Sequence, residues 1–186
     1  MLRKILTYGT GAGLIAGIPM SGMVLAMSGQ QMMSYGMVLG YLTMLIALSA
    51  VFVAIKRHRD VDGGGVIRFW PAFGLGLGIS AVAGVLYALT WELAQAATHM
   101  DFASDYAKAM IQQQREKGAS PEALAKLSAE MDAFKVQYAS PLFRLPMTFV
   151  EIFPVGVLVS LVSAGLLRNP RFLPARRGPG SLWPVR

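Results

Sequence analysis

Two carboxylates, Glu92 and Glu151, lie in strongly apolar parts of this chain and are its candidates for chemistry. Glu92 is near the end of an uncharged stretch that begins at Phe69, and Glu151 lies seven residues beyond Arg144 in another. An ionisable side chain at membrane depth is costly and marks a functional site by default. The alternative is structural, because a protonated or paired carboxylate also holds two helices together.

Polar neighbours of both acids recur at helical spacing. Gln95 and His99 follow Glu92, and Thr148 and Arg144 precede Glu151, in each case by steps of three and four residues. On antiparallel helices the two ladders match in depth and place Glu92 opposite Glu151. We therefore predict one coupled proton or cation site, open to the external face, made of Glu92, Glu151, Gln95, Thr148, His99 and Arg144. Arg144 lies about 10 Å outward of Glu151 along a helix, so a direct bridge between them is less favoured.

Other catalytic and ligand-binding patterns are missing from the sequence. The absence of cysteine excludes disulfides, thiolate metal sites and a cysteine nucleophile. The two histidines, His58 and His99, are expected on opposite sides of a membrane, so they do not form one metal site. No zinc-protease, serine-hydrolase or nucleotide-binding motif occurs. We expect no enzyme activity, no cofactor and no metal.

The elements that position these residues are predicted to be membrane helices. Hydrophobic residues make up 54% of the chain and charged residues only 15%, against about 25% in soluble domains. The 51 residues between Lys4 and Lys56 carry no charge, which is enough for two spans and a turn at Ser28-Gly29-Gln30-Gln31. Spans are expected at about 4–27, 34–55, 69–93 and 145–167. The predicted fold is all-α, an integral membrane four-helix bundle of two transmembrane hairpins; a cleaved signal peptide is the alternative for the first span.

The polar segment of about 98–140 is predicted to be an external helical hairpin. Gly118 ends its first helix, and Ser120-Pro121 begins the second. Each helix has a narrow apolar seam: Phe102, Tyr106 and Met110 on the first, and Leu124, Leu127, Met131, Phe134 and Tyr138 on the second. These seams either pack on each other or dock a partner.

Small residues recur every four positions in the predicted spans. Such stripes let helix backbones approach closely, within one chain or between copies of a homo-oligomer. The predicted packing residues are Gly9, Gly13, Gly17, Gly36, Gly40, Gly76, Gly84 and Gly156.

The distribution of basic residues predicts the orientation. The N-terminus, the loop 56–68 and the tail from Arg168 onward hold 11 of the 17 Lys and Arg residues, so both termini are expected in the cytoplasm. The membrane domain is residues 1–168, and residues 169–186 form a basic, Pro- and Gly-rich tail. The loop and tail either only set topology or also attract anionic lipids of the bilayer. Nothing supports nucleic-acid binding.

Three short motifs in a fixed order carry a family resemblance. They are Gly63-Gly64-Gly65-Val66-Ile67 with Phe69, Ala72 and Phe73; Trp91-Glu92; and Glu151-Ile152-Phe153-Pro154-Val155-Gly156. Together they resemble the family filed as domain of unknown function 4199, over about residues 3–168. The resemblance implies a small bacterial membrane protein with two hairpins and a polar segment before the last helix. It implies no activity.

Two functions remain open at this level. The first is a non-enzymatic accessory or assembly protein of a bacterial inner membrane, which binds membrane partners through its small-residue faces and external hairpin. The second is a small oligomeric transporter or channel-like protein that uses Glu92 and Glu151 as a proton or cation site.

Overall fold

The computed structural model describes residues 1–26, 30–98 and 101–175, and between 24 and 37 it describes no side chains. All regular structure in these ranges is helical, as predicted. The predicted turn at Ser28-Gly29 and the tail from 176 onward lie outside the described residues. The elements are α1 (Leu2–Ala26), α2 (Gln30–Arg57), a π-helical turn η1 (His58–Asp62), α3 (Phe69–Thr98), α4 (Phe102–Glu116), α5 (Pro121–Tyr138) and α6 (Pro141–Leu167).

Three helical segments of the described chain are long and apolar enough to cross a membrane. They are Val38–Asp62, Phe69–Thr98 and Pro141–Leu167. The part of α1 with described side chains is not among them. Three of the four predicted spans are thus supported by length and composition.

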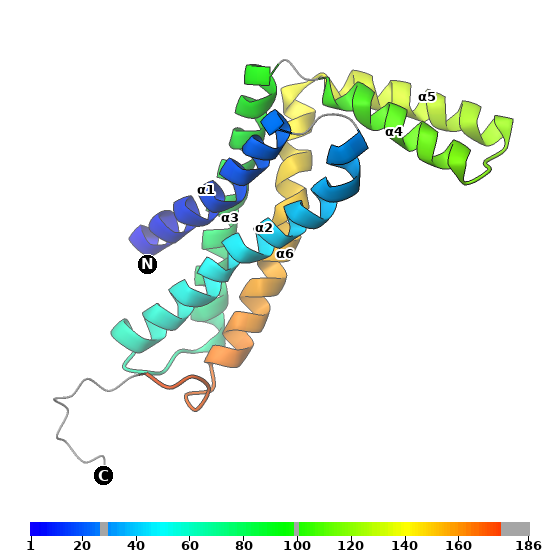
Figure 1. Ribbon diagram of the computed structural model, residues 1–186. Coiled ribbons are helices and arrows are strands. Elements are labelled where there is room, and N and C mark those ends of the chain that lie inside the picture. Colours follow the sequence, from blue (N-terminus) through cyan, green and yellow to red (C-terminus); the bar gives the residue numbers. More distant parts are fainter. Residues whose placement is uncertain (27–29, 99–100, 176–186) are drawn as a thin grey trace, which may run out of the picture.

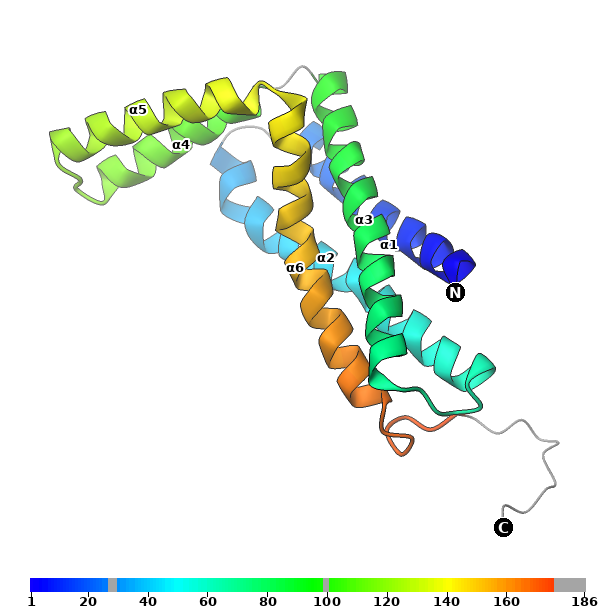
Figure 2. The same cartoon turned by 180° about the vertical axis from the view of Figure 1, so that it is seen from behind.

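Helix α3 lies at the centre of the bundle, between α1 and α6 (Figures 1 and 2). α1 runs parallel to α3, because Gly9, Gly13 and Gly17 face successively later α3 residues. A methyl group added at Gly9 would lie 2.6 Å from Val82 Cβ, and one at Gly13 would lie 2.7 Å from Leu86 Cβ. No side chain larger than hydrogen fits there without a shift of one helix.

α6 packs antiparallel on the other side of α3 through small residues from both helices. A methyl group at Gly156 would lie 2.5 Å from Ser80 Cβ, and one at Gly76 would lie 2.8 Å from Ser160 Cβ. The Ser160 hydroxyl donates to the carbonyl of Gly156, so its polarity is satisfied inside the helix. The buried core then continues over α2 with Leu48, Val51 and Ile55.

Most of the predicted packing glycines are therefore used within the chain. Those in close contact with another helix are Gly9, Gly13, Gly17, Gly76, Gly84 and Gly156. Gly40 differs, because nothing lies within 4 Å of an added methyl group. The surroundings of Gly36 lie outside the described residues. The small-residue faces fit intramolecular packing better than oligomer contact.

The polar segment forms the predicted helical hairpin, which extends sideways from one end of the bundle (Figures 1 and 2). Asp101 begins α4 by accepting a hydrogen bond from the amide of Ser104, and Ser120 begins α5 by accepting one from Ala123. The Ser104 hydrogen bond holds the pKa of Asp101 below its usual value. Gly118, at φ +77°, reverses the chain between them as predicted.

The aromatic residues of the two predicted seams pack against each other. The ring centroids of Tyr106 and Phe134 are 5.8 Å apart. Those of Phe102 and Tyr138 are 5.6 Å apart. Packing of one helix on the other therefore covers this part of both seams.

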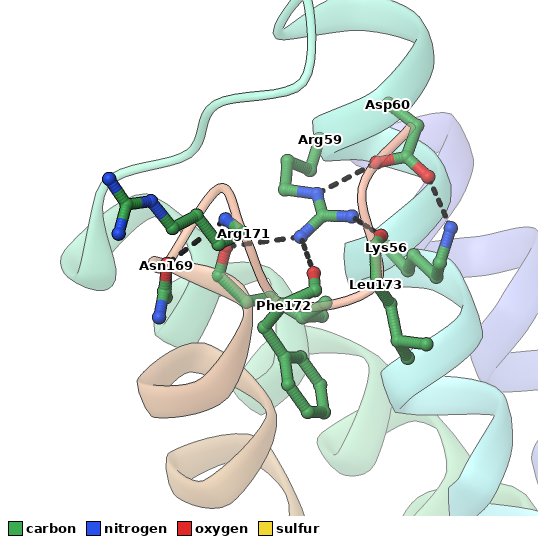
Figure 3. Close-up of polar contacts among 8 residues, drawn as sticks. Lys56, Arg59, Asp60, Asn169, Arg171, Phe172 and Leu173 are labelled. Carbon is green, nitrogen blue, oxygen red and sulfur yellow. Dashed lines mark hydrogen bonds and ion pairs between the residues drawn. The ribbon is translucent and has the colours of Figure 1, made fainter. Parts of the chain in front are cut away.

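The opposite end of the bundle is closed by Arg59, a fully buried side chain of η1 (Figure 3). Its guanidinium donates to the carbonyls of Leu167, Phe172 and Leu173 and, through Nε, to Asp60 at 2.7 Å. These are carbonyls at and beyond the end of α6, where no further turn can satisfy them. The loop 56–68 is thus joined to the C-terminal segment.

Several charges of that loop are paired rather than free to face lipid. Asp60 accepts from Lys56 as well as Arg59, and Asp62 accepts from Lys4 and faces His58. Arg57, Arg68, Arg168 and Arg171 are exposed basic residues of this end of the described chain.

The close approach of α3 and α6 generates a matched pair of predictions. Gly156→Ala places a methyl group against Ser80 and is expected to lower the free energy of unfolding by about 1–3 kcal/mol. Gly74→Ala lies on the same bundle with nothing within 4 Å and should change stability by less than about 1 kcal/mol. Unfolding in mixed micelles with sodium dodecyl sulfate measures both. Equal effects of the two substitutions would contradict the packing described.

Candidate functional site

Glu92 forms a two-pronged ion pair with Arg144. Arg144 Nε donates to Glu92 Oε1 at 2.8 Å, and Nη2 donates to Oε2 at 2.7 Å. The side chain of Arg144 is only 16% exposed and that of Glu92 only 19%, so water screens their charges weakly. This geometry uses the planar fork of arginine fully and leaves Glu92 with a counter-charge.

Tyr138, the last residue of α5, connects the hairpin to both neighbouring spans. Its hydroxyl accepts hydrogen bonds from Trp91 Nε1 at 2.8 Å and Gln95 Nε2 at 3.0 Å. Its carbonyl accepts from Arg144 at 3.0 Å, and the guanidinium also lies over its ring, 5.7 Å from the centroid. Burial raises the pKa of Tyr138 above its ordinary value, so the hydroxyl stays protonated. Together, Trp91, Gln95, Glu92, Tyr138 and Arg144 form what we call the hairpin root.

The expected pairing of Glu92 with Glu151 is wrong. On α6, Glu151 lies seven residues beyond Arg144, about 10 Å deeper along the helix. A slip of two helical turns along α3 puts Arg144, at the other end of its ladder, opposite Glu92 in place of Glu151. The Gly–Ser contacts between α3 and α6 decide the register, and they place Arg144 opposite Glu92.

Glu151 instead lines a cavity together with Thr148, Tyr87 and Trp91. Its side chain is exposed, and among the described residues it has no hydrogen-bond or ion-pair partner. Thr148 is buried one turn away. The two acids therefore stand in different settings: Glu92 is neutralised in the hairpin root, and Glu151 faces a cavity.

The other members of the predicted site divide in the same way. Gln95 binds Tyr138 of the hairpin rather than Thr148. His99 lies outside the described residues. The structure thus brings Glu92, Gln95 and Arg144 together in one group, and Thr148 and Glu151 in another.

Two residues at these sites were not singled out from the sequence. Tyr138 is the last aromatic residue of its seam, but nothing in the spacing shows that its hydroxyl bonds α3. Arg59 is indistinguishable from its basic neighbours in the loop. Trp91 is 4% exposed and donates to Tyr138, while Trp70, at the other end of α3, is 75% exposed.

No group of three or more His, Cys, Asp or Glu side chains capable of holding a metal occurs within residues 1–26, 30–98 and 101–175. The chemistry available at the cavity is therefore that of a single carboxylate among apolar and aromatic groups. It can attract a cation or exchange a proton.

The chain belongs to the family described as Protein of unknown function (DUF4199), whose model matches residues 7–169. The match covers the three candidate spans, the hairpin and Arg59, and confirms the resemblance noted in the sequence. No curated protein and no solved structure matches the chain.

The ion pair of the hairpin root predicts an energetic coupling between α3 and α6. In a double-mutant cycle of Glu92→Gln and Arg144→Gln, each single change leaves one charge without its partner, whereas the double change leaves none. The coupling free energy is expected to be about 0.5–3 kcal/mol, measured by unfolding in mixed micelles. The matched cycle at Lys126 and Glu130, whose exposed side chains lie 4.0 Å apart, should give about 0.3–0.5 kcal/mol. Additive effects at Glu92 and Arg144 would show that the pair contributes no specific stability.

Proposed function

We propose that this member of the family is a non-enzymatic accessory or assembly protein of a bacterial cytoplasmic membrane, with four spans and an external hairpin that binds a membrane partner. The observation that carries the proposal is the way the hairpin is held. Its root is bonded to α3 and α6 through Tyr138 and Arg144, while α4 and α5 extend sideways beyond the bundle (Figure 1). A helix pair fixed at one end and exposed along its length is suited to binding another protein.

The outer face of α5 is the part of this hairpin best suited to contact. Ala125, Ala129 and Ala133 are all exposed and recur every four residues. Val136 continues this face toward the root and is 77% exposed. Because the glycine faces of the spans are already packed inside the chain, the proposed partner surface is the hairpin.

The fourth proposed span is α1. Its 25 residues are long enough to cross about 30 Å of hydrocarbon, and it lies parallel to α3, a candidate span. With α1, α2, α3 and α6 as spans, both termini and η1 lie on one side, and the hairpin lies on the other. The basic residues concentrate on the side of the termini, which supports its being cytoplasmic.

This topology predicts the labelling of single cysteines, which can be introduced freely because the chain has none. Val61→Cys is on the proposed cytoplasmic side at a position that is 71% exposed, and Lys117→Cys is on the exposed tip of the hairpin. A membrane-impermeant maleimide should label position 117 on intact cells and position 61 only after permeabilisation. The reverse pattern would invert the topology.

Partner binding predicts site-specific photo-crosslinking in native membranes. A photoreactive phenylalanine analogue at Ala129, on the outer face of α5, is expected to give a protein adduct. The same analogue at Leu158, a 62% exposed residue of α6 that faces the proposed lipid, serves as the matched control and should give none. Adducts from Leu158 but not from Ala129 would move the partner surface to the spans, and an adduct of twice the chain mass would identify a homo-oligomer.

A second candidate function, an oligomeric transporter or channel-like protein, is favoured by one observation. Glu151 faces a cavity without a basic partner among the described residues, as a proton or cation site requires. Glu92 no longer supports it, because Arg144 neutralises that acid. This function further requires a path for water from the cavity to the cytoplasmic side.

A further inference from the structure

The cavity that Glu151 faces lies under the hairpin root, between α1, α2, α3 and α6. Its volume is about 580 Å³, within the range of about 300–1,000 Å³ found for small-molecule sites. Ala16 and Met20 line it from α1, Leu39 and Gly40 from α2, and Met147 from α6. It therefore opens among the membrane helices and is bounded by the first turns of the hairpin at Phe102.

Its walls are apolar and rich in aromatic rings. Tyr41, Tyr87 and Trp91 contribute from the spans, and Tyr106 and Phe134 contribute from the hairpin. Aromatic faces attract organic cations within about 6 Å, and they serve repeatedly in the recognition of quaternary ammonium groups. Flexible methionines next to them accept a chain of variable shape.

Glu151 is the one charged residue among those that line the cavity. Its nearest basic residue along α6, Arg144, is engaged by Glu92. Within the part of the chain that the structure describes, Glu151 makes no ion pair with a basic side chain. A carboxylate among apolar walls is costly unless something neutralises it.

We propose that this cavity binds a single-chain organic cation, with its ammonium group at Glu151 and its alkyl chain between the methionines and aromatic rings. The charge of Glu151 selects the cationic head group, because a neutral ligand would leave the carboxylate uncompensated. The volume selects one chain, because the two acyl chains and head group of a phospholipid exceed a cavity of this size. This site goes beyond the proposed partner binding and does not depend on it, since it uses none of the outer face of α5.

Two variants separate the head group from the chain. Glu151→Gln removes the charge and keeps nearly the same shape. Gly40→Leu fills the cavity with an alkyl group; nothing lies within 4 Å of an added Cβ there, so the helix accepts it without a clash at Cβ. Gly74→Leu is the matched control, because that glycine is equally open and lies outside the cavity. Glu130→Gln controls for the loss of one acid on the hairpin surface.

The experiment measures binding of octyltrimethylammonium and of neutral octyl glucoside to the full chain in phosphatidylglycerol nanodiscs, by the shift of the thermal unfolding midpoint. Each probe partitions into the same bilayer to the same extent whichever variant is present, so comparing the affinity ratio between variants removes the contribution of partition. We expect Glu151→Gln to lower the ratio of cation to glucoside affinity about tenfold, which corresponds to about 1.4 kcal/mol. Gly40→Leu should weaken both probes at least tenfold, and both control variants should match the natural chain.

Three outcomes would overturn the assignment. An unchanged affinity ratio in Glu151→Gln would remove the role of the carboxylate. Full binding by Gly40→Leu would place the alkyl chain elsewhere. Competition by phosphatidylethanolamine added to the nanodiscs would show that a two-chain lipid amine occupies the cavity instead. None of these results bears on crosslinking from Ala129, so this inference and the proposed function fail separately.

Discussion

The close approach of α3 to the helices on both its sides is the constraint on which the rest of this structure depends. Glycines of α1 lie against Val82 and Leu86, and glycine and serine alternate across the contact between α3 and α6. In a membrane no hydrophobic effect drives such contacts, so the fit of small residues supplies the attraction and fixes the register. A slip of one turn would place a side chain where only hydrogen fits.

That register explains why the helices were easier to predict than the site. Uncharged stretches, Gly118 and Ser120 locate the helices, because length, hydropathy and end residues are local properties. The pairing of Glu92 is not local: spacing along each helix shows which polar residues share a face, but it does not fix how far α6 is shifted along α3. The small residues of α3 and α6 contain the missing information, since Gly156 fits against Ser80 and Gly76 against Ser160. The roles of Arg59 and Tyr138 depend on contacts with residues far away in the sequence, which spacing along a helix does not reveal.

The register also gives the two acids different environments from the same composition. Arg144 forms an ion pair with Glu92 and joins the bundle to the hairpin, so the charge of Glu92 is neutralised within the structure. Glu151, two turns deeper, is left with the aromatic and methionine side chains of the cavity. The ion pair between Glu92 and Arg144 thus joins the hairpin to the bundle. Because this pair occupies Arg144, the only arginine of α6, the carboxylate of Glu151 is available to a cationic ligand. The pairing of Arg144 with Glu92 therefore determines both how the hairpin is attached and why Glu151 has no arginine beside it.

Arg59 has a consequence for how the chain is completed during synthesis. Helix α6 has no glycine directly after its last residue, and the carbonyl of that residue, Leu167, accepts a hydrogen bond from a side chain that is synthesised 108 residues earlier. Arg59 is therefore synthesised before α6. Its guanidinium, in the loop after α2, is the donor for the carbonyl at the end of this helix. Leu173 carries the last carbonyl that Arg59 bonds. Changes in length or charge beyond that residue remove none of the hydrogen bonds that Arg59 makes to the C-terminal segment.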